Sequence, residues 1–526
     1  MADWYNLLEE PWIEAVSKQT HKSEHIGIEG LLVNAHRYSE IYGKTPLLTY
    51  GMYRFLITLV SDMFEITDID HINQLCEKAS FNEQTIVEYC EMYSDEFFLF
   101  SDHTPFLQNH RLGYLKPSSV AKLFHHIPSG SNHVIFHPEL FYEDTQAFCP
   151  ELCAQGLTAL SPFAIGFGAS HKNPDTGKLV RYTSSINKSP PWYFIIEPKD
   201  ATLFDVLLVN SCGMKLKENT GTGQVFWKRN REEMEFHRKA SDVSTLEGMM
   251  WMPRQVHLHY EHKGDCTYCG HETEFPVKDI KFCQGWKVSK KFKWRDPHAL
   301  YTKSSKRART YNDVKPRVYN PAYIVLYSLV FPEAFYEGGY KLPVGLTQLR
   351  KLGLDDQGFT LKAFGIKTEV GKAAKFLEFC EESVYISGEI SIKNEKRKVI
   401  SEGLGRLNAI KELLTTTLYY LLTNSKRSEI QTITTEEGYR FLKIAHLPFK
   451  RFINEIRSAE DVPENKLGTF TSALLNTAES ILDNYITYRS ADILKEEMDQ
   501  LRSFYFQSLR LLQKDPTQSK SVPESN

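Results

Sequence analysis

The chain has 526 residues, of which 41% are hydrophobic and 25% are charged, and its formal net charge is -3. This composition is typical of a globular protein. The chain is longer than chains that fold around a single hydrophobic core, which predicts roughly two to four domains. Because the chain is not basic overall, its surface cannot be cationic throughout. Any contact with nucleic acid therefore requires lysines and arginines that are clustered.

The opening sequence, MADWYNLLEEPW, lacks the basic segment and apolar run of a signal peptide. The early apolar stretch Phe55–Val60 is too short to cross a bilayer. Nine cysteines, an odd number, argue against a disulfide framework. We therefore expect a cytoplasmic protein with no membrane contact, in which paired cysteines point toward a metal.

The first 395 residues mix helical and extended patterns. Apolar periodicity predicts helices over Leu31–Arg37 and Pro46–Phe64. Polar and glycine-containing composition predicts a loop over Gly166–Gly177. Apolar runs and alternation predict three strands: Trp192–Ile196, Val256–Tyr260 and Val384–Ile392.

The pattern changes near residue 400, where apolar residues recur every three, four or seven positions, as in an amphipathic helix. Further helical stretches follow near 434–457, 464–487 and 490–513, with a helix start at Thr434 and a kink at Pro448. Short connections favour an antiparallel four-helix bundle. The charged run Lys393–Arg397 is the expected linker.

The predicted fold class is therefore α+β, with a large mixed N-terminal domain that carries a zinc knuckle and a C-terminal antiparallel four-helix bundle. We expect the mixed domain to span residues 1–395 and the bundle to span 396–514. The polar tail, 515–526, contains two prolines and is expected to be disordered.

Two cysteine pairs have the spacing of a metal site: Cys149 with Cys153, and Cys266 with Cys269. Pairs separated by two or three residues can chelate Zn²⁺ from one turn, and four thiolates would make a closed, structural site. Separate buried thiols are the alternative interpretation. Four nearby histidines are further candidate ligands: His257, His259, His262 and His271.

The segment Lys281–Arg317 contains twelve lysines and arginines against two acids. Phosphate neutralisation is the natural use of such a stretch, with Phe292 and Trp294 interleaved among the cations, and each phosphate contact adds salt dependence. A solvated surface without a nucleic-acid partner is the alternative.

No nucleotide-binding or hydrolase motif is complete. In Gly365–Lys372 five residues separate the glycines and Ala373 follows the lysine, which excludes a phosphate-binding loop of the usual type. The nearest approach to a nuclease site is His257 and His259 beside the second cysteine pair, where a bound metal could activate water.

Five local sequences follow one another along the chain: Tyr5–Ile13, Leu31–Arg37 with Pro46 and Arg54, Pro105–Gln108, Trp251–Gln255 and Asp296–Tyr301. In this order they resemble the CasA family, the large subunit of the type I-E CRISPR surveillance complex (Cascade). The C-terminal helices match that family in position and type, whereas residues 310–395 match it poorly.

The resemblance implies a non-catalytic subunit that recognises the protospacer-adjacent motif in double-stranded DNA and promotes strand opening, while the guide RNA reads the target. It also implies contacts with the 5′ end of the guide RNA, with other Cascade subunits and with a recruited helicase–nuclease. A subset of the family carries a structural zinc ion bound by cysteines, so the resemblance also implies a zinc ion in this chain. A zinc-dependent nuclease and a purely architectural scaffold are the alternatives.

The resemblance further implies where DNA and RNA are contacted. Asn132 lies in the part that resembles the loop near the guide RNA's 5′ end. The expected minor-groove loop contains Gly166, Phe167, Gly168 and Ala169. One of Lys287, Lys290 and Lys291 is the expected motif-contacting lysine, and Thr368, Glu369 and Lys372 are wedge candidates. Ordinary turns are the alternative for both loops, and minor-groove reading predicts a tolerant motif.

Overall fold

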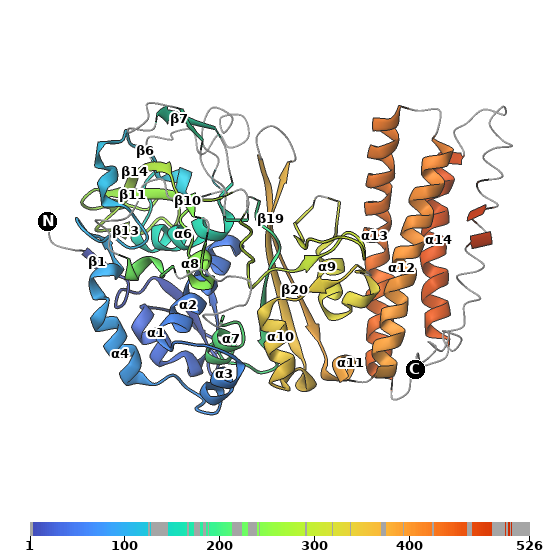
Figure 1. The fold of residues 1–526 in the computed structure, drawn as a ribbon, viewed down its shortest axis with the longest axis horizontal. Coiled ribbons are helices and arrows are strands. Elements are labelled where there is room, and N and C mark those ends of the chain that lie inside the picture. The colour runs from blue at the N-terminus through green and yellow to red at the C-terminus, as the bar shows by residue number, and fades with distance from the viewer. Residues whose placement is uncertain are drawn as a thin grey trace.

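A computed structural model gives the structure of the chain. It describes residues 4–124, 127, 146–165, 168–172, 179–181, 186–187, 189–212, 223–229, 239–240, 242–289, 292–317, 319–336, 338–369, 375–392, 394–422, 426–459, 465–486, 500, 503–504 and 506–507. Three parts follow one another along the longest axis: a mixed N-terminal part, a central sheet with its helices, and long C-terminal helices (Figure 1).

The N-terminal part is built around helix α2, Pro46–Met63, which confirms the helix predicted over Pro46–Phe64. The Thr45 side chain caps its first turn by accepting a hydrogen bond from the Leu48 N–H, and Pro46 occupies the first helical position. All residues of α2 after Pro46 are buried, as is typical of a helix that packs against the core on every side. No helix of the described chain combines the length and apolarity that a membrane crossing requires.

Short elements surround α2. Strand β2 (Ile13–Ser17) pairs with β3 (Ser23–Ile26) and β4 (Tyr38–Tyr42), and β1 (Trp4–Asn6) pairs with β5 (Phe98–Phe100). The helix predicted over Leu31–Arg37 is instead two elements, helix α1 (Ile28–Val33) and a 3-10 turn at Ala35–Arg37. The remaining helices of this part are α3 (Ile69–Cys76), α4 (Glu83–Met92), α6 (Pro150–Phe163), α7 (Leu203–Val209) and α8 (Thr245–Met249).

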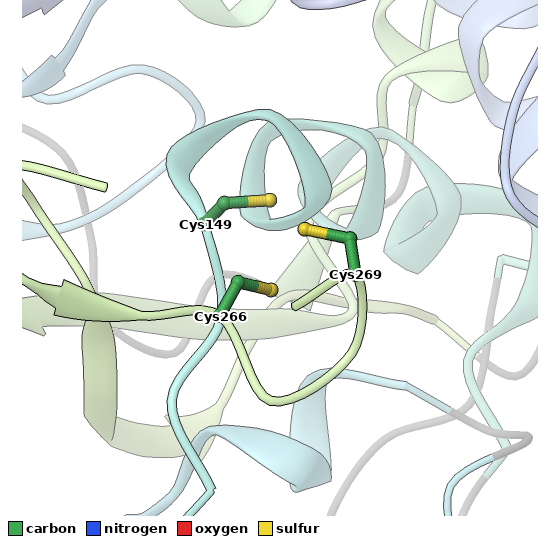
Figure 2. Close-up of side chains that lie close together, drawn as sticks. All are labelled: Cys149, Cys266 and Cys269. Atoms are coloured by element: carbon green, nitrogen blue, oxygen red, sulfur yellow. The ribbon is translucent and has the colours of Figure 1, made fainter. Parts of the chain in front are cut away.

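A second small sheet carries the cysteine knuckle. Its central strand β14 (Val277–Gln284) pairs with β11 (Arg254–Tyr260), which confirms the strand predicted there, and with β6 (Ser118–Ser119). The hairpin of β12 (Gly264–Asp265) and β13 (Glu272–Thr273) holds Cys266 and Cys269 against the start of α6, where Cys149 lies (Figure 2).

The central sheet has the order β20, β19, β9 and joins two cores. Strand β9 is Tyr193–Pro198, β19 is Phe359–Glu369 and β20 is Lys375–Ile386. Side chains alternate between its faces: Tyr193 and Phe364 pack into the N-terminal core, whereas Phe194 and Leu361 pack into a core shared with the C-terminal helices. The elements beside this sheet are α9 (Ala322–Val330), α10 (Val344–Lys351), β16 (Tyr301–Thr302), β17 (Asn312–Asp313) and β18 (Tyr340–Lys341).

The structure corrects two sequence predictions, one at the end of the central sheet and one in a separate two-stranded sheet. The strand expected over Val384–Ile392 ends at Ile386, and Gly388–Ile392 forms helix α11. Gly388 lies so close to the Asp356 carbonyl that a Cβ could not fit there. The range Gly166–Gly177, expected to be a loop, contains strand β7, Gly168–Lys172, which pairs with β8, Leu179–Arg181.

The C-terminal helices are α12 (Asn394–Leu421), α13 (Arg427–Ser458) and α14 (Lys466–Ile486). The charged run expected as a linker is helical from Asn394, and Lys396 in it is buried. Thr434 does not start a helix, because α13 begins at Arg427 and the Thr434 hydroxyl donates back to the Ile430 carbonyl at 2.8 Å. Pro448 lies inside α13 without ending it. The fourth expected helix, 490–513, lies almost wholly outside the described residues.

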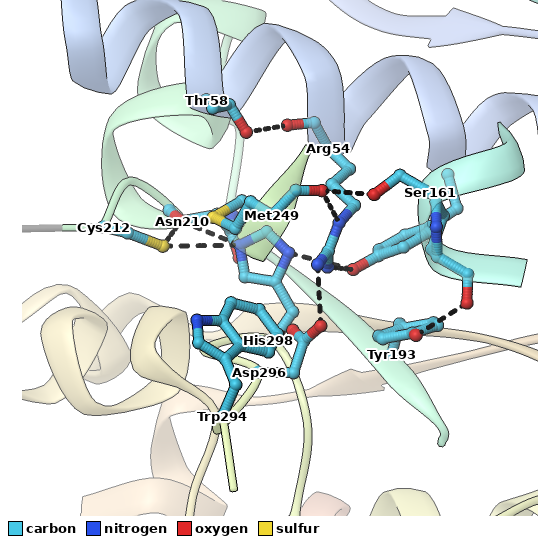
Figure 3. Close-up of polar contacts among 12 residues, drawn as sticks. Arg54, Thr58, Ser161, Tyr193, Asn210, Cys212, Met249, Trp294, Asp296 and His298 are labelled. Atoms are coloured by element: carbon cyan, nitrogen blue, oxygen red, sulfur yellow. Dashed lines mark hydrogen bonds and ion pairs between the residues drawn. The ribbon is translucent and has the colours of Figure 1, made fainter. Parts of the chain in front are cut away.

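A fully buried ion pair joins α2 to the segment before β16. Arg54 Nη2 lies 2.8 Å from Asp296 Oδ2, and both side chains are 1% exposed or less. The same guanidinium donates to the Met249 carbonyl at 2.7 Å and to the Tyr50 hydroxyl at 3.1 Å (Figure 3). It also lies 5.4 Å from the ring centroid of Tyr193 in β9. One cation therefore connects α2, the end of α8, the segment at residue 296 and the central sheet.

The surroundings of this ion pair are polar and hydrogen-bonded. The Tyr50 hydroxyl meets His298 Nδ1 at 3.0 Å, and His298 Nε2 meets the Asn210 carbonyl at 3.1 Å. Burial lowers the pKa of His298 to about 4, so this ring is neutral at pH 7. Asp296 also accepts the His298 backbone N–H at 3.0 Å. A buried charge pair with satisfied partners is costly to break on one side only.

We predict that Arg54→Met lowers the free energy of unfolding by about 3 to 5 kcal/mol, because it leaves the Asp296 carboxylate buried without its cation. The double variant Arg54→Met with Asp296→Leu should be less destabilised than the single variant, since no uncompensated charge remains. Urea-induced unfolding measures both.

Lys466→Gln is the matched control, because its partner Glu455 lies 2.9 Å away but both side chains are exposed. Its effect should stay below about 1 kcal/mol. A loss for Arg54→Met no larger than that of the control would contradict a structural role for the buried pair.

Candidate functional site

The three cysteines Cys149, Cys266 and Cys269 form a cluster in which all the sulfur atoms lie within 4.8 Å of one another. Figure 2 shows their side chains pointing toward a common centre. Tetrahedral thiolates at about 2.3 Å from Zn²⁺ would lie roughly 3.8 Å apart, so the cluster has the dimensions of a zinc site.

The backbone of the knuckle supports thiolate ligands. The Gly270 N–H donates to the Cys266 carbonyl at 2.8 Å, with Gly270 at a positive φ of 75° that closes the turn. The neighbouring Cys149 thiol lowers the pKa of Cys266, while the pKa of Cys149 is raised. Backbone N–H groups of Tyr268 and Cys269 also lower the pKa of Cys266. These are the features that a zinc knuckle requires.

Cys153 does not belong to this cluster, which corrects the predicted set of four. It lies one turn into α6, is fully buried in the N-terminal core, and burial raises its pKa well above the usual value. The spacing of three residues fits chelation from a turn, but here the chain between the two cysteines is helical, and the sulfur of Cys153 is fully buried, where it interacts electrostatically with Cys266 without joining the cluster. The three clustered cysteines could hold a zinc ion and cross-link α6 to the knuckle.

The basic stretch lines a cavity of about 480 Å³ with Lys293, Arg295, Arg309 and Lys315. Tyr311 lies at its wall, with Lys303 Nζ 4.8 Å and Lys341 Nζ 5.1 Å from the ring centroid. The cavity therefore concentrates positive charge around an aromatic ring, as an anion or a nucleic-acid backbone requires.

Two aromatic residues of this stretch differ in their role. Trp294 is buried, and its indole N–H donates to the Ser244 carbonyl at 3.0 Å, so it belongs to the core. Phe292 is half-buried at the cavity wall. Sequence reasoning missed Tyr311 and its contact with Lys341, because Lys341 is brought beside the Tyr311 ring by the pairing of β18 with β16 at Tyr301. No local signal in the sequence indicates that pairing.

The entry to the predicted minor-groove loop is held by a buried arginine. Arg254 in β11 donates from its guanidinium to the carbonyl of Ile165, directly before Gly166, and this guanidinium lies 5.2 Å from the Phe282 ring centroid. Gly168 and Ala169 are the first residues of β7. Gly166 and Phe167 lie outside the described residues.

Lys287, a candidate for the motif-contacting lysine, is exposed at the start of β15, Lys287–Val288, which pairs in parallel with β10, Lys239–Ala240. Burial of part of its side chain lowers its pKa. Lys290 and Lys291, the other two candidates, lie outside the described residues.

The wedge candidates fall on the hairpin of β19 and β20. Thr368 and Glu369 are the last residues of β19 and pair with Phe376 and Lys375, so the segment Gly365–Glu369 is strand. The last part of β19 and strand β7 lie toward the same side of the molecule (Figure 1). Lys372 and Asn132 lie outside the described residues.

We predict that the purified chain carries a stoichiometric amount of zinc. The Cys266→Ser variant should lose this zinc and the Cys153→Ala variant should retain it, because Cys266 belongs to the cluster and Cys153 does not. Elemental analysis of the dialysed proteins measures the metal. Free zinc at about 100 times its dissociation constant should stabilise the wild-type chain by about 2.7 kcal/mol. Loss of zinc from both variants alike would contradict the three-cysteine site.

Comparisons with known proteins agree on one family. The family model for CRISPR-associated protein Cse1 matches residues 6–481. The CRISPR-associated protein CasA/Cse1 of Thermus thermophilus is 27% identical over 215 residues, which is 39% of this chain and 39% of that relative. The sequence match thus spans less than half the length of that relative.

Solved structures share the fold over nearly the whole chain. The structure of Thermus thermophilus CasA (Cse1) is 18% identical, with a TM-score of 0.68 over 97% of this chain and 99% of that one. A chain of a structure described as a CRISPR RNA-guided surveillance complex is 17% identical, with a TM-score of 0.75 over 96% of this chain and 100% of that one. Because the family model covers residues 6–481, this chain belongs to the CRISPR-associated protein Cse1 (CasA) family.

Proposed function

We propose that this chain is the non-catalytic large subunit of an RNA-guided CRISPR antiviral complex of the Cascade type, and that it works in the cytoplasm. In this proposal it recognises the protospacer-adjacent motif in double-stranded DNA, promotes strand opening and helps recruit a separate helicase–nuclease. The observation that carries the proposal is family membership over residues 6–481. The chain of the surveillance complex that shares this fold supports the assembly with other subunits and guide RNA.

Motif reading is assigned to the Gly166–Ala169 segment. Its start is fixed by the buried hydrogen bond from Arg254 to the Ile165 carbonyl, and glycine lets a backbone approach a groove closely. The minor groove distinguishes mainly A·T from G·C pairs, so the accepted motifs should be several related sequences. Lys287, Lys290 or Lys291 would add a contact to the same duplex.

Strand opening is assigned to the closed end of the β19–β20 hairpin, with Thr368, Glu369 and Lys372 as wedge residues. The long antiparallel pairing from Phe359 to Glu369 makes this hairpin a stiff projection. Lys362 in β19 is tied by ion pairs to Glu40 at 2.9 Å and to Glu197 at 2.6 Å, which fixes the hairpin to the N-terminal part. A rigid element is what separating a base pair requires.

The basic cavity is assigned to phosphate contacts, and Asn132 to the region near the guide RNA's 5′ end. The domain ranges 1–395 and 396–514, with a fourth bundle helix, remain part of the proposal. The bundle would then contact other Cascade subunits. A zinc ion on the cysteine cluster would be structural and would hold the knuckle beside α6.

We predict that Gly166→Phe with Gly168→Phe weakens binding to a motif-bearing duplex at least about tenfold, or about 1.4 kcal/mol, because bulky side chains block the close approach. The measurement is duplex binding by the reconstituted guide RNA complex, with and without this chain, on matched targets that carry or lack a candidate motif. Gly113→Phe is the control, because a Cβ at Gly113 meets no atom within 4 Å.

Three results would contradict the proposed function in different ways. Cleavage by the chain alone with a divalent metal would favour a zinc-dependent nuclease. Binding that depends on the chain but not on the motif would favour an architectural scaffold. Unchanged motif-dependent binding by the double glycine variant would remove the loop from recognition while leaving the subunit role intact.

We also predict that Lys306→Gln with Arg307→Gln reduces the slope of log binding constant against log salt concentration by about 2, because two released counterions are lost. Both side chains are exposed in the basic stretch. Duplex binding by the complex across a salt series measures the slope. Lys22→Gln with Lys78→Gln, also exposed but outside the stretch, should leave it unchanged. Equal slopes for both variants would exclude phosphate contacts here.

A further inference from the structure

A groove of about 340 Å³ lies beside strand β11, away from the cysteine cluster's ligands. Val256 and Leu258 belong to the core, although Leu258 also borders the groove, and His257 and His259 line the groove from the same strand. The other wall includes Asp102 and the segment after β5. Two imidazoles thus lie side by side on one face of a paired, rigid strand.

The two rings approach each other and leave nitrogen atoms without partners. Their centroids are 4.9 Å apart with planes at 61°. His257 Nδ1 and His259 Nε2 are each buried and lack a hydrogen-bond partner among the described residues. Buried polar atoms are nearly always paired, so two such atoms on neighbouring rings indicate a missing ligand.

Charges of both signs surround the two rings. In the β11–β14 ladder Asp279 lies opposite His259, and Asp102 lies in the groove and acts electrostatically on His257. Lys281 lies opposite His257, but its ammonium donates to the Gly113 carbonyl at 2.5 Å. Neutral imidazole is a common metal ligand.

We propose that His257 and His259 bind a divalent transition-metal ion in this groove, as a second metal site distinct from the cysteine cluster. Neutral imidazole suits zinc, copper and nickel, and the two ligands stand at alternate positions of one strand. Among the described residues, His257 and His259 belong to no group of three ligand atoms within 4.8 Å of one another, so water would fill the remaining positions, with Asp102 in the same groove. This inference is independent of the proposed DNA recognition.

The test uses the full chain with its cysteine cluster first loaded with zinc, then titrated with Co²⁺ alone. Binding to the histidine groove should give visible d–d absorption without the near-ultraviolet band of thiolate-bound cobalt. His257→Asn with His259→Asn should abolish this absorption, and each single variant should weaken Co²⁺ binding by more than the roughly 10- to 100-fold that loss of an outer-shell partner causes.

His25→Asn is the matched control, because His25 is exposed on β3, which belongs to a different sheet from β11. Thermal unfolding without cobalt checks that the variants fold, and a cobalt-dependent rise in Tm should occur in the wild-type chain and the control only. Undiminished Co²⁺ uptake by the double histidine variant, or cobalt spectra with the thiolate band alone, would overturn the proposal.

Discussion

The buried Arg54 side chain connects four parts of this molecule. Its guanidinium reaches Asp296, the Met249 carbonyl and the Tyr50 hydroxyl, and it lies over Tyr193. Since an unpaired charge is strongly disfavoured at such depth, these partners must arrive together, which fixes α2 against the central sheet. One face of this sheet packs into the N-terminal core and the other into the core shared with the C-terminal helices.

The sequences that carry the family resemblance are mostly packing sequences. Arg54 and Asp296 form the buried pair, Trp251 packs against Trp286 with ring centroids 5.3 Å apart, and the Gln108 side chain accepts the Leu258 N–H at 2.7 Å. Such residues identify the fold because few substitutions satisfy a buried polar contact. They say little about the surfaces that bind partners, which explains why the fold was more predictable than the site.

Sequence patterns within a single segment correctly predicted several helices and strands. Helix α2 and strands β9 and β11 follow from capping, apolar runs and alternation. The errors arose where tertiary packing decides: Thr434 looks like a cap yet lies inside α13, and Cys153 has chelating spacing yet is turned into the core by its helix. The basic stretch was visible in the sequence, but the contact of Lys341 with Tyr311 at the cavity wall depends on the β16–β18 pairing, which no short-range pattern encodes.

The central sheet imposes an order on synthesis. Ile196 in β9 pairs with Leu361 in β19, so β9 leaves the ribosome long before its partner strand exists. At typical elongation rates of about 5 to 20 residues per second, the apolar β9 waits on the order of ten to thirty seconds for β19. During that interval its edge and the second core's apolar face are open to other chains. Productive folding of this subunit therefore depends on shielding a nascent strand, by chaperones or by slow collapse of the N-terminal part.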